Sequence, residues 1–162
     1  MNELFDIKDD VVVITGGTGI LGRCIGKYLA RQGSKVVILG RRQDVGQTIV
    51  DDIRKAGGEA SYFKTDVMKK DLVEKNCRDI IAKYGKIDTL LNAAGGNMTG
   101  AVIAPDQTFF DLKPEAFQKV LDLNLVGTVI PTQVFLQPMV KRGKGSIINF
   151  SSMAAFRPMT RV

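Results

Sequence analysis

Five short apolar runs along the chain alternate with longer segments in which apolar side chains recur every three or four positions. The first run, Val11–Thr15, is rich in β-branched residues and lies between charged residues and glycines. A run of this kind is typical of a strand that is covered on both faces of a sheet. The pattern predicts further strands of the same character at residues 34–39, 60–64, 87–91 and 146–150.

The segments between these runs have the spacing of amphipathic helices. Glycines at Gly33, Gly57 and Gly85 follow the first three segments and are typical of helix ends. The apolar positions on the helical faces are Ile20, Leu21, Ile25, Tyr28 and Leu29, then Val45, Ile49, Ile53 and Ala56, then Leu72, Val73, Cys77, Ile80, Ile81 and Tyr84. Strands that alternate with such helices pair in parallel through right-handed crossovers. The sequence therefore predicts an α/β fold, a Rossmann-type doubly wound parallel sheet in a three-layer α/β/α arrangement.

Length and composition fit one domain in a reducing compartment. At 162 residues, 44% of them hydrophobic, the chain is long enough for one core, although a complete doubly wound enzyme domain usually needs more. No linker, low-complexity tract or repeat divides it, so we expect a single domain over residues 1–162. Cys24 and Cys77 lie far apart in helical segments, and we expect both to be small buried hydrophobic residues.

Composition excludes several classes of function. The sequence contains no histidine, which excludes Ser-His-Asp hydrolysis and every zinc motif that needs imidazole, and we expect no metal site. The net charge of +6 comes from Lys and Arg scattered among acids without a basic stripe, so we expect no nucleic-acid binding. A mildly basic surface is more often just solvated, and an anionic cofactor suits the charge equally well. The apolar stretch 123–140 is interrupted by Asn124, Gly127, Pro131, Gln133 and Pro138. With no signal region at the N-terminus, we expect a cytoplasmic protein with no membrane span.

A glycine-rich turn follows the first predicted strand. Residues 15–22 read TGGTGILG and place Gly17-x-Gly19-x-x-Gly22 where the strand passes into a helix. Such a turn lets the backbone approach a pyrophosphate and points free N–H groups at it from the positive end of a helix. The alternative is a plain glycine turn that begins a helix. The predicted cofactor-binding residues here are Gly16, Gly17, Thr18, Gly19, Ile20, Leu21 and Gly22.

The end of the second strand bears on the choice of cofactor. In dinucleotide sites an acid at this point usually binds the adenosine ribose, but here the sequence reads Leu39-Gly40-Arg41-Arg42. A guanidinium at Arg41 would instead pair with a 2′-phosphate, so the sequence favours NADP(H) over NAD(H). The alternative is that both arginines are solvated loop charges.

Four stretches together resemble the short-chain dehydrogenase/reductase family. They are TGGTGILG at 15–22, Asp66-Val67 after the third strand, LNAAGG at 91–96 and INFSS at 148–152, in the family's order over nearly the whole chain. The resemblance implies an NAD(P)-dependent oxidoreductase that transfers hydride between nicotinamide and the carbonyl or alcohol carbon of a small-molecule substrate. It also implies a homodimer or homotetramer.

The resemblance assigns cofactor roles residue by residue. Asp66 and Val67 would meet the adenine, and residues 92–95 would match the family's NNAG segment beside the cofactor. Ordinary strand-end turns are the alternative for both stretches. The residues of the second stretch are Asn92, Ala93, Ala94 and Gly95.

Two residues match catalytic positions of the family. Ser152, the second serine of INFSS, would orient the substrate oxygen. Asn124 would hold a water beside the catalytic lysine. It shares a helical face with Phe117, Val120 and Leu121, and an amide in an apolar stripe needs hydrogen-bond partners, so a satisfied core amide is the alternative.

The proton-transferring Tyr-x-x-x-Lys of the family is not in this sequence. Tyr28, Tyr62 and Tyr84 have no lysine four residues later. We therefore expect an N-terminal part of a longer enzyme, truncated before that motif and before the last strands and helices. A non-catalytic dinucleotide-binding module is one alternative. Another is a nucleotide-sugar epimerase of the family's extended branch, because the spacing of the first turn is closer to that branch, whereas NAAG and the INFSS strand favour the classical branch.

A long segment, residues 95–112, separates the NAAG-like stretch from Asn124. Long loops beside the substrate side of a sheet are often functional. Together with AAGGN before it and FFDL at its end, the segment resembles D-mannonate oxidoreductases (fructuronate reductases) and related sugar-acid reductases. For such a substrate, Asn97, Thr99 or Arg157 would serve as hydrogen-bond donors, and surface polarity is the alternative for all three.

Overall fold

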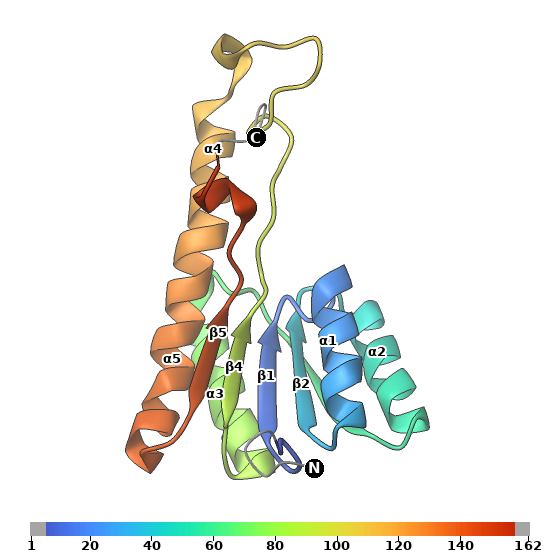
Figure 1. Cartoon of the computed structure of the whole chain (residues 1–162). Coiled ribbons are helices and arrows are strands. Elements are labelled where there is room, and N and C mark those ends of the chain that lie inside the picture. Colours follow the sequence, from blue (N-terminus) through green and yellow to red (C-terminus); the bar gives the residue numbers. More distant parts are fainter. Residues whose placement is uncertain (1–5, 158–162) are drawn as a thin grey trace.

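The computed structural model describes residues 6–157 and contains one parallel sheet (Figure 1). The strands are β1 (Val11–Thr15), β2 (Lys35–Gly40), β3 (Glu59–Lys64), β4 (Thr89–Asn92) and β5 (Ser146–Asn149). Their order is β3-β2-β1-β4-β5, and every neighbouring pair is parallel. The predicted strands and the α/β fold class are confirmed.

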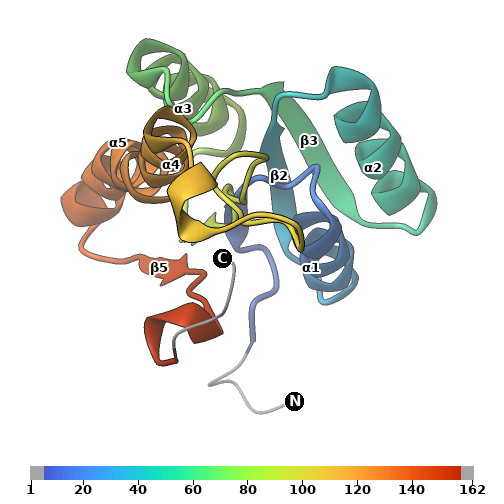
Figure 2. The same ribbon diagram turned by 90° about the horizontal axis from the view of Figure 1, so that it is seen from above.

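Helices cover both faces of the sheet (Figure 2). Because side chains alternate along a strand, Val11 and Val13 of β1 pack with α3 (Lys70–Tyr84) and α5 (Gly127–Arg142). Val12 and Ile14 point the other way and pack with α1 (Ile20–Arg31) and α2 (Gln43–Lys55). Two apolar layers therefore fix the strand ends from which the site is built.

The buried face of α1 agrees with the predicted one at Ile25 and Leu29, which are partly buried and pack against the core, but differs at the other three positions. Ile20, Leu21 and Tyr28 are 74%, 62% and 59% exposed. The buried positions are instead Gly22, Gly26 and Ala30, spaced four residues apart. A Cβ on Gly26 would lie 3.1 Å from the Ile38 side chain, so small residues are what let α1 approach the sheet.

The two cysteines have different environments. Cys77 is buried, as predicted, and burial raises the pKa of its thiol to about 11. Cys24 is exposed, so its predicted burial was wrong. It lies on the outer face of α1, because the contact of this helix with the sheet is made by the small residues.

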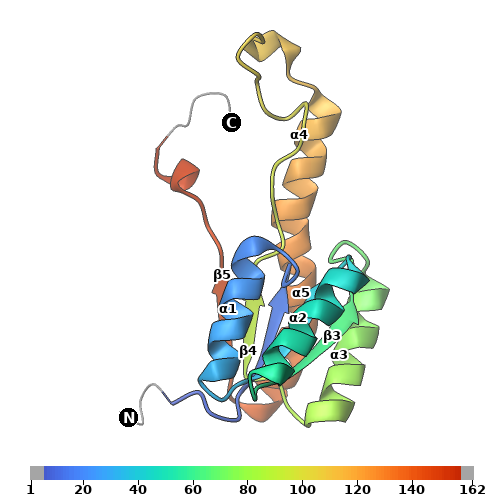
Figure 3. The same cartoon turned by 90° about the vertical axis from the view of Figure 1, so that its right-hand side faces the viewer.

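A long helix extends past the carboxyl edge of the sheet (Figures 1 and 3). It begins as α4 (Pro114–Leu121), passes through a π-helical turn, η3 (Asp122–Val126), and continues as α5. The 3-10 turn η2 (Phe109–Asp111), closed by a capping box between Thr108 and Asp111, precedes it.

Among residues 6–157, this 29-residue helix is the segment that is long and apolar enough to cross a membrane by length and composition alone. Core helices of globular domains pass the same test. Val134, Phe135 and Met139 of α5 are buried against the sheet, as expected of a layer helix. The absence of a membrane span stays a prediction.

Candidate cofactor site

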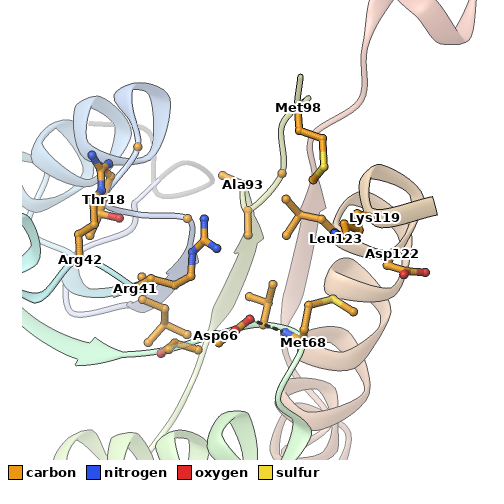
Figure 4. Close-up of a pocket in the computed structure, with 18 residues that line it drawn as sticks. Thr18, Arg41, Arg42, Asp66, Met68, Ala93, Met98, Lys119, Asp122 and Leu123 are labelled. Atoms are coloured by element: carbon orange, nitrogen blue, oxygen red, sulfur yellow. Dashed lines mark hydrogen bonds between the residues drawn. The ribbon is translucent and has the colours of Figure 1, made fainter. Parts of the chain in front are cut away.

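A cavity of about 550 Å³ opens at the carboxyl edge of the sheet (Figure 4). Its walls come from the turn after β1, the end of β2, the turn after β3, residues 93–95 with Met98, and the helix around residues 119–123. β1 lies between β2 and β4, so the cavity sits where the strand order reverses. Ligands of open parallel sheets bind at such a point.

The turn after β1 divides its predicted residues between lining and packing. Gly16, Thr18 and Gly19 line the cavity. The N–H of Gly17 donates to the Leu39 carbonyl at 2.9 Å, so this residue joins the turn to β2. A Cβ on Gly22 would lie 2.6 Å from the Gly16 carbonyl oxygen, so its role is close packing.

The side chains of Ile20 and Leu21 are exposed and do not line the cavity. Their relevant groups are in the backbone, because they form the first turn of α1. Gly19 begins this helix without a side-chain cap, and the first N–H groups of a helix have no intrahelical partner. The positive end of α1 is therefore available to an anion.

The two arginines after β2 have different partners. The Nη2 of Arg42 donates to the Thr18 carbonyl at 2.6 Å, so Arg42 holds the glycine-rich turn. Both arginines line the cavity, and the Arg41 side chain extends into it (Figure 4). Between residues 6 and 157 neither arginine forms an ion pair, and the Arg41 guanidinium, unlike that of Arg42, makes no hydrogen bond. Arg41 is therefore the guanidinium that is placed to meet a bound anion.

Asp66 and Val67 also line the cavity, in the turn between β3 and α3. The Asp66 Oδ1 accepts the N–H of Met68 at 3.1 Å (Figure 4), and the Asp66 carbonyl accepts the N–H of Lys69 at 3.0 Å. These bonds close the turn and present its residues to the cavity.

The NAAG-like stretch is part buried support and part cavity wall. Asn92 is buried, and its Nδ2 donates to Thr132 Oγ1 and Asn149 Oδ1, both at 2.9 Å. It thereby links β4 to α5 and β5 and lies outside the cavity wall. The three residues that follow, Ala93, Ala94 and Gly95, all line the cavity.

Thr15 fixes this wall to the first strand. Its Oγ1 accepts the N–H groups of both Ala93 and Ala94 at 3.2 Å, and the residue is fully buried.

Thr15→Val would leave two N–H groups without their acceptor, so we expect the free energy of unfolding of the whole protein to fall by about 2 kcal/mol. Urea denaturation measures the loss. Thr15→Ser keeps the hydroxyl and should lose less than half as much; an equal loss would contradict this role.

Asn124 lies in the π-helical turn η3 and bonds to the loop after β4. Its Nδ2 donates to the carbonyls of Gly96 and Val120, both at 2.8 Å, and its Oδ1 accepts the Gly96 N–H at 3.0 Å. Phe117 and Leu121 on the same face are 47% and 42% exposed, so this amide is satisfied but does not lie in a core. Single π-turns inside helices frequently mark functional sites.

Ser152 lies beyond β5 and does not line the cavity. Its Oγ accepts the Ala154 N–H at 3.2 Å and caps the 3-10 turn η4 (Met153–Ala155). This turn is above the carboxyl end of β5, on the same edge of the sheet as the cavity (Figure 1). Ser152 is exposed, and its catalytic role stays a prediction.

The geometry agrees with comparisons to known proteins. A family model described as short chain dehydrogenase matches residues 10–162. The chain belongs to the short-chain dehydrogenase family. An uncharacterized oxidoreductase, UxuB, of Bacillus subtilis is 39% identical over 97% of this chain and 59% of its own length. A 3beta-hydroxysteroid dehydrogenase of Mediterraneibacter gnavus is 32% identical over 94% of this chain and 52% of its own length.

Solved structures of the family share this fold. A putative D-mannonate oxidoreductase from Haemophilus influenza with bound NAD has a TM-score of 0.90 and 32% identity, over 97% of this chain and 60% of that one. An actinorhodin polyketide ketoreductase with NADPH has a TM-score of 0.85 and 27% identity, over 94% of this chain and 57% of that one. This short-chain dehydrogenase sequence therefore spans only part of the length of its relatives, 59% in the case of UxuB.

The structure adds cavity residues that the family motifs did not point to. Met98 comes from the long loop, and Lys119, Asp122 and Leu123 come from the long helix. Asp122 and Leu123 directly precede Asn124, so the motif already lay beside them. Met98 and Lys119 carried no sequence signal, because the packing of the loop beside the helix brings them to the cavity.

Proposed function

We propose that the whole protein is a nicotinamide-dependent oxidoreductase that transfers hydride between the cofactor and a carbonyl or alcohol carbon. The observation that carries this proposal is the cavity at the reversal of strand order, with the uncapped N-terminus of α1 at its rim. The residues present fit a dinucleotide, because Gly16 and Gly19 line the cavity without side chains and leave the backbone bare for a pyrophosphate to approach. The cofactor supplies the hydride chemistry, and the chain supplies alignment.

For the substrate we propose a sugar acid such as mannonate or fructuronate. The name of a 32% identical structure, a putative D-mannonate oxidoreductase, supports this choice. The long loop also supports this choice, since its residues Asn97 and Thr99 are exposed next to lining residues of the cavity. A third polar residue, Arg157, is exposed after η4. These side chains would donate to the hydroxyls and carboxylate of such a substrate.

An activity assay on the whole protein tests the function. We expect mannonate oxidation with NADP⁺ or NAD⁺, or fructuronate reduction with the reduced cofactors, followed by absorbance at the nicotinamide band. Turnover of a 3β-hydroxysteroid alone would reject the sugar acid but keep the oxidoreductase. Tight binding of a dinucleotide with no turnover of any carbonyl or alcohol would favour a non-catalytic binding module.

We also propose that the whole protein is cytoplasmic and forms a homodimer or homotetramer.

Arg41 supports a preference for NADP(H), because both arginines line the cavity but the Arg42 guanidinium is already bonded to the Thr18 carbonyl. We expect Arg41→Ala to lower the ratio of NADPH to NADH affinity by about tenfold, the size of one charge-assisted contact. Arg42→Ala is the matched control. It should weaken both cofactors by a similar factor, because it loosens the glycine-rich turn. Fluorescence titration gives both ratios, and an unchanged ratio in Arg41→Ala would remove the basis for NADP(H).

A further inference from the structure

A buried amide on α3 is bonded to the turn that carries Asp66. Asn76 is 4% exposed, and its Nδ2 donates to the Lys64 carbonyl at 3.0 Å and to Thr65 Oγ1 at 2.8 Å. Its buried neighbours on the same helix, Val73 and Cys77, are apolar. If this position served packing alone, an apolar side chain would suffice, because a buried amide costs free energy unless it is hydrogen-bonded.

Asn76 completes a set of bonds around Thr65. The Thr65 hydroxyl donates to the Phe63 carbonyl at 2.9 Å while it accepts from Asn76, and its N–H donates to the Gly40 carbonyl at 2.9 Å. Thr65 is 2% exposed and lines the cavity together with the two residues that follow it. The turn that presents Asp66 is therefore held from β2 on one side and from α3 on the other.

We propose that Asn76 is a positioning residue for the cofactor, which acts by holding residues 65–67 where the adenosine half binds. It does not line the cavity itself, so its effect passes through Thr65. This inference rests on the proposed function. If Asn76 is lost, the turn is anchored from the β2 side alone, and the alignment of Asp66 and Val67 loosens without any change at the glycine-rich turn.

The experiment compares three variants of the whole protein. Asn76→Ala removes both donated bonds, and Asn76→Asp keeps the shape but places a carboxylate against the Lys64 carbonyl. Cys77→Ala truncates a buried neighbour in the apolar cluster and leaves both bonds of Asn76 in place. Fluorescence titration measures affinity for NADPH and NADH, and competition measures affinity for ADP-ribose, which lacks nicotinamide. Hydrogen exchange follows the amides of Thr65, Met68 and Lys69, with those of β1 as the internal reference.

We expect Asn76→Ala to weaken NADPH, NADH and ADP-ribose by the same factor of about five, the loss of roughly one net hydrogen bond. Asn76→Asp should weaken them at least as much. The three turn amides should exchange faster while those of β1 do not. Cys77→Ala should lose stability but keep all three affinities.

Wild-type affinities in Asn76→Ala, or an equal loss in Cys77→Ala, would overturn the positioning role and leave the proposed function in place. A wild-type protein that binds neither dinucleotide would overturn both.

Discussion

Replacing Gly16 by alanine should abolish tight binding of either dinucleotide, with a loss of affinity of at least about 100-fold. Gly16 has a φ of +63°, and a Cβ there would lie 2.5 Å from the Ala93 carbonyl oxygen and 2.7 Å from the Ala94 Cα. Both atoms are backbone and belong to the opposite wall of the cavity. A side chain would therefore separate the glycine-rich turn from the stretch after β4 and change the spacing of the site.

The same substitution should lower the free energy of unfolding of the whole protein by about 3 kcal/mol, from left-handed strain plus overpacking. Gly57→Ala is the matched control, because Gly57 also has a positive φ, +83°, but a Cβ on it would have no neighbouring atom within 4 Å. That variant should lose only about 1 kcal/mol and bind cofactor normally. Urea denaturation and fluorescence titration give both quantities. Equal losses in the two variants would show that close approach of the two walls does not matter.

The strands were predictable because their signal is local. Each run is short and lies beside charge or glycine, and all but residues 60–64 contain β-branched residues. The register of the parallel sheet places all the strand ends at one edge. The contact face of α1 was not predictable in the same way. Hydrophobic periodicity gives most weight to large side chains such as Ile20 and Leu21, whereas this helix approaches the sheet through Gly26.

The part of the site that lies at the strand ends was predictable, because each of these turns carries a short local motif. Gly16, Arg41, Asp66 and Ala94 come from four different turns, and all line the same cavity. The walls contributed by the long loop and the long helix were not predictable, because they depend on how residues far apart in the chain pack. Motif membership also did not reveal which residues line the cavity and which support it, and Asn92 is one of the supporting residues.

The opposite edge of the sheet is held together by one buried carboxylate. Asp88 accepts the Val11 N–H at 2.8 Å, pairs with Lys86 at 2.9 Å and pairs with Arg142 at 2.6 Å. Its backbone carbonyl accepts the Ser146 N–H at 2.8 Å. The residue thus joins the starts of β1, β4 and β5 to the end of α5.

Asp88→Asn should therefore lower the free energy of unfolding of the whole protein by about 2 kcal/mol at neutral pH. The amide keeps an oxygen for Val11 but loses the charge that both cations face. We place the loss below that of a fully buried pair because the Lys86 and Arg142 side chains are 38% and 32% exposed, and water screens them. Asp52→Asn is the control, since Asp52 pairs with Lys27 at 2.7 Å on the surface and should contribute little.

The pH dependence of that difference follows from the carboxyl group itself. Burial acts to raise the pKa of Asp88, but the Val11 N–H, Lys86 and Arg142 together outweigh it and hold the pKa below its ordinary value of 3.8. A folded pKa below the unfolded one gives stability that is complete above the unfolded value and is lost as pH falls through the folded value. The stability gap between wild type and Asp88→Asn should thus be constant from pH 7 down to about 4 and close in stronger acid. Urea denaturation across this range measures it, and a gap that closes above pH 5 would mean that Asp88 is not held as the charged partner of Lys86 and Arg142.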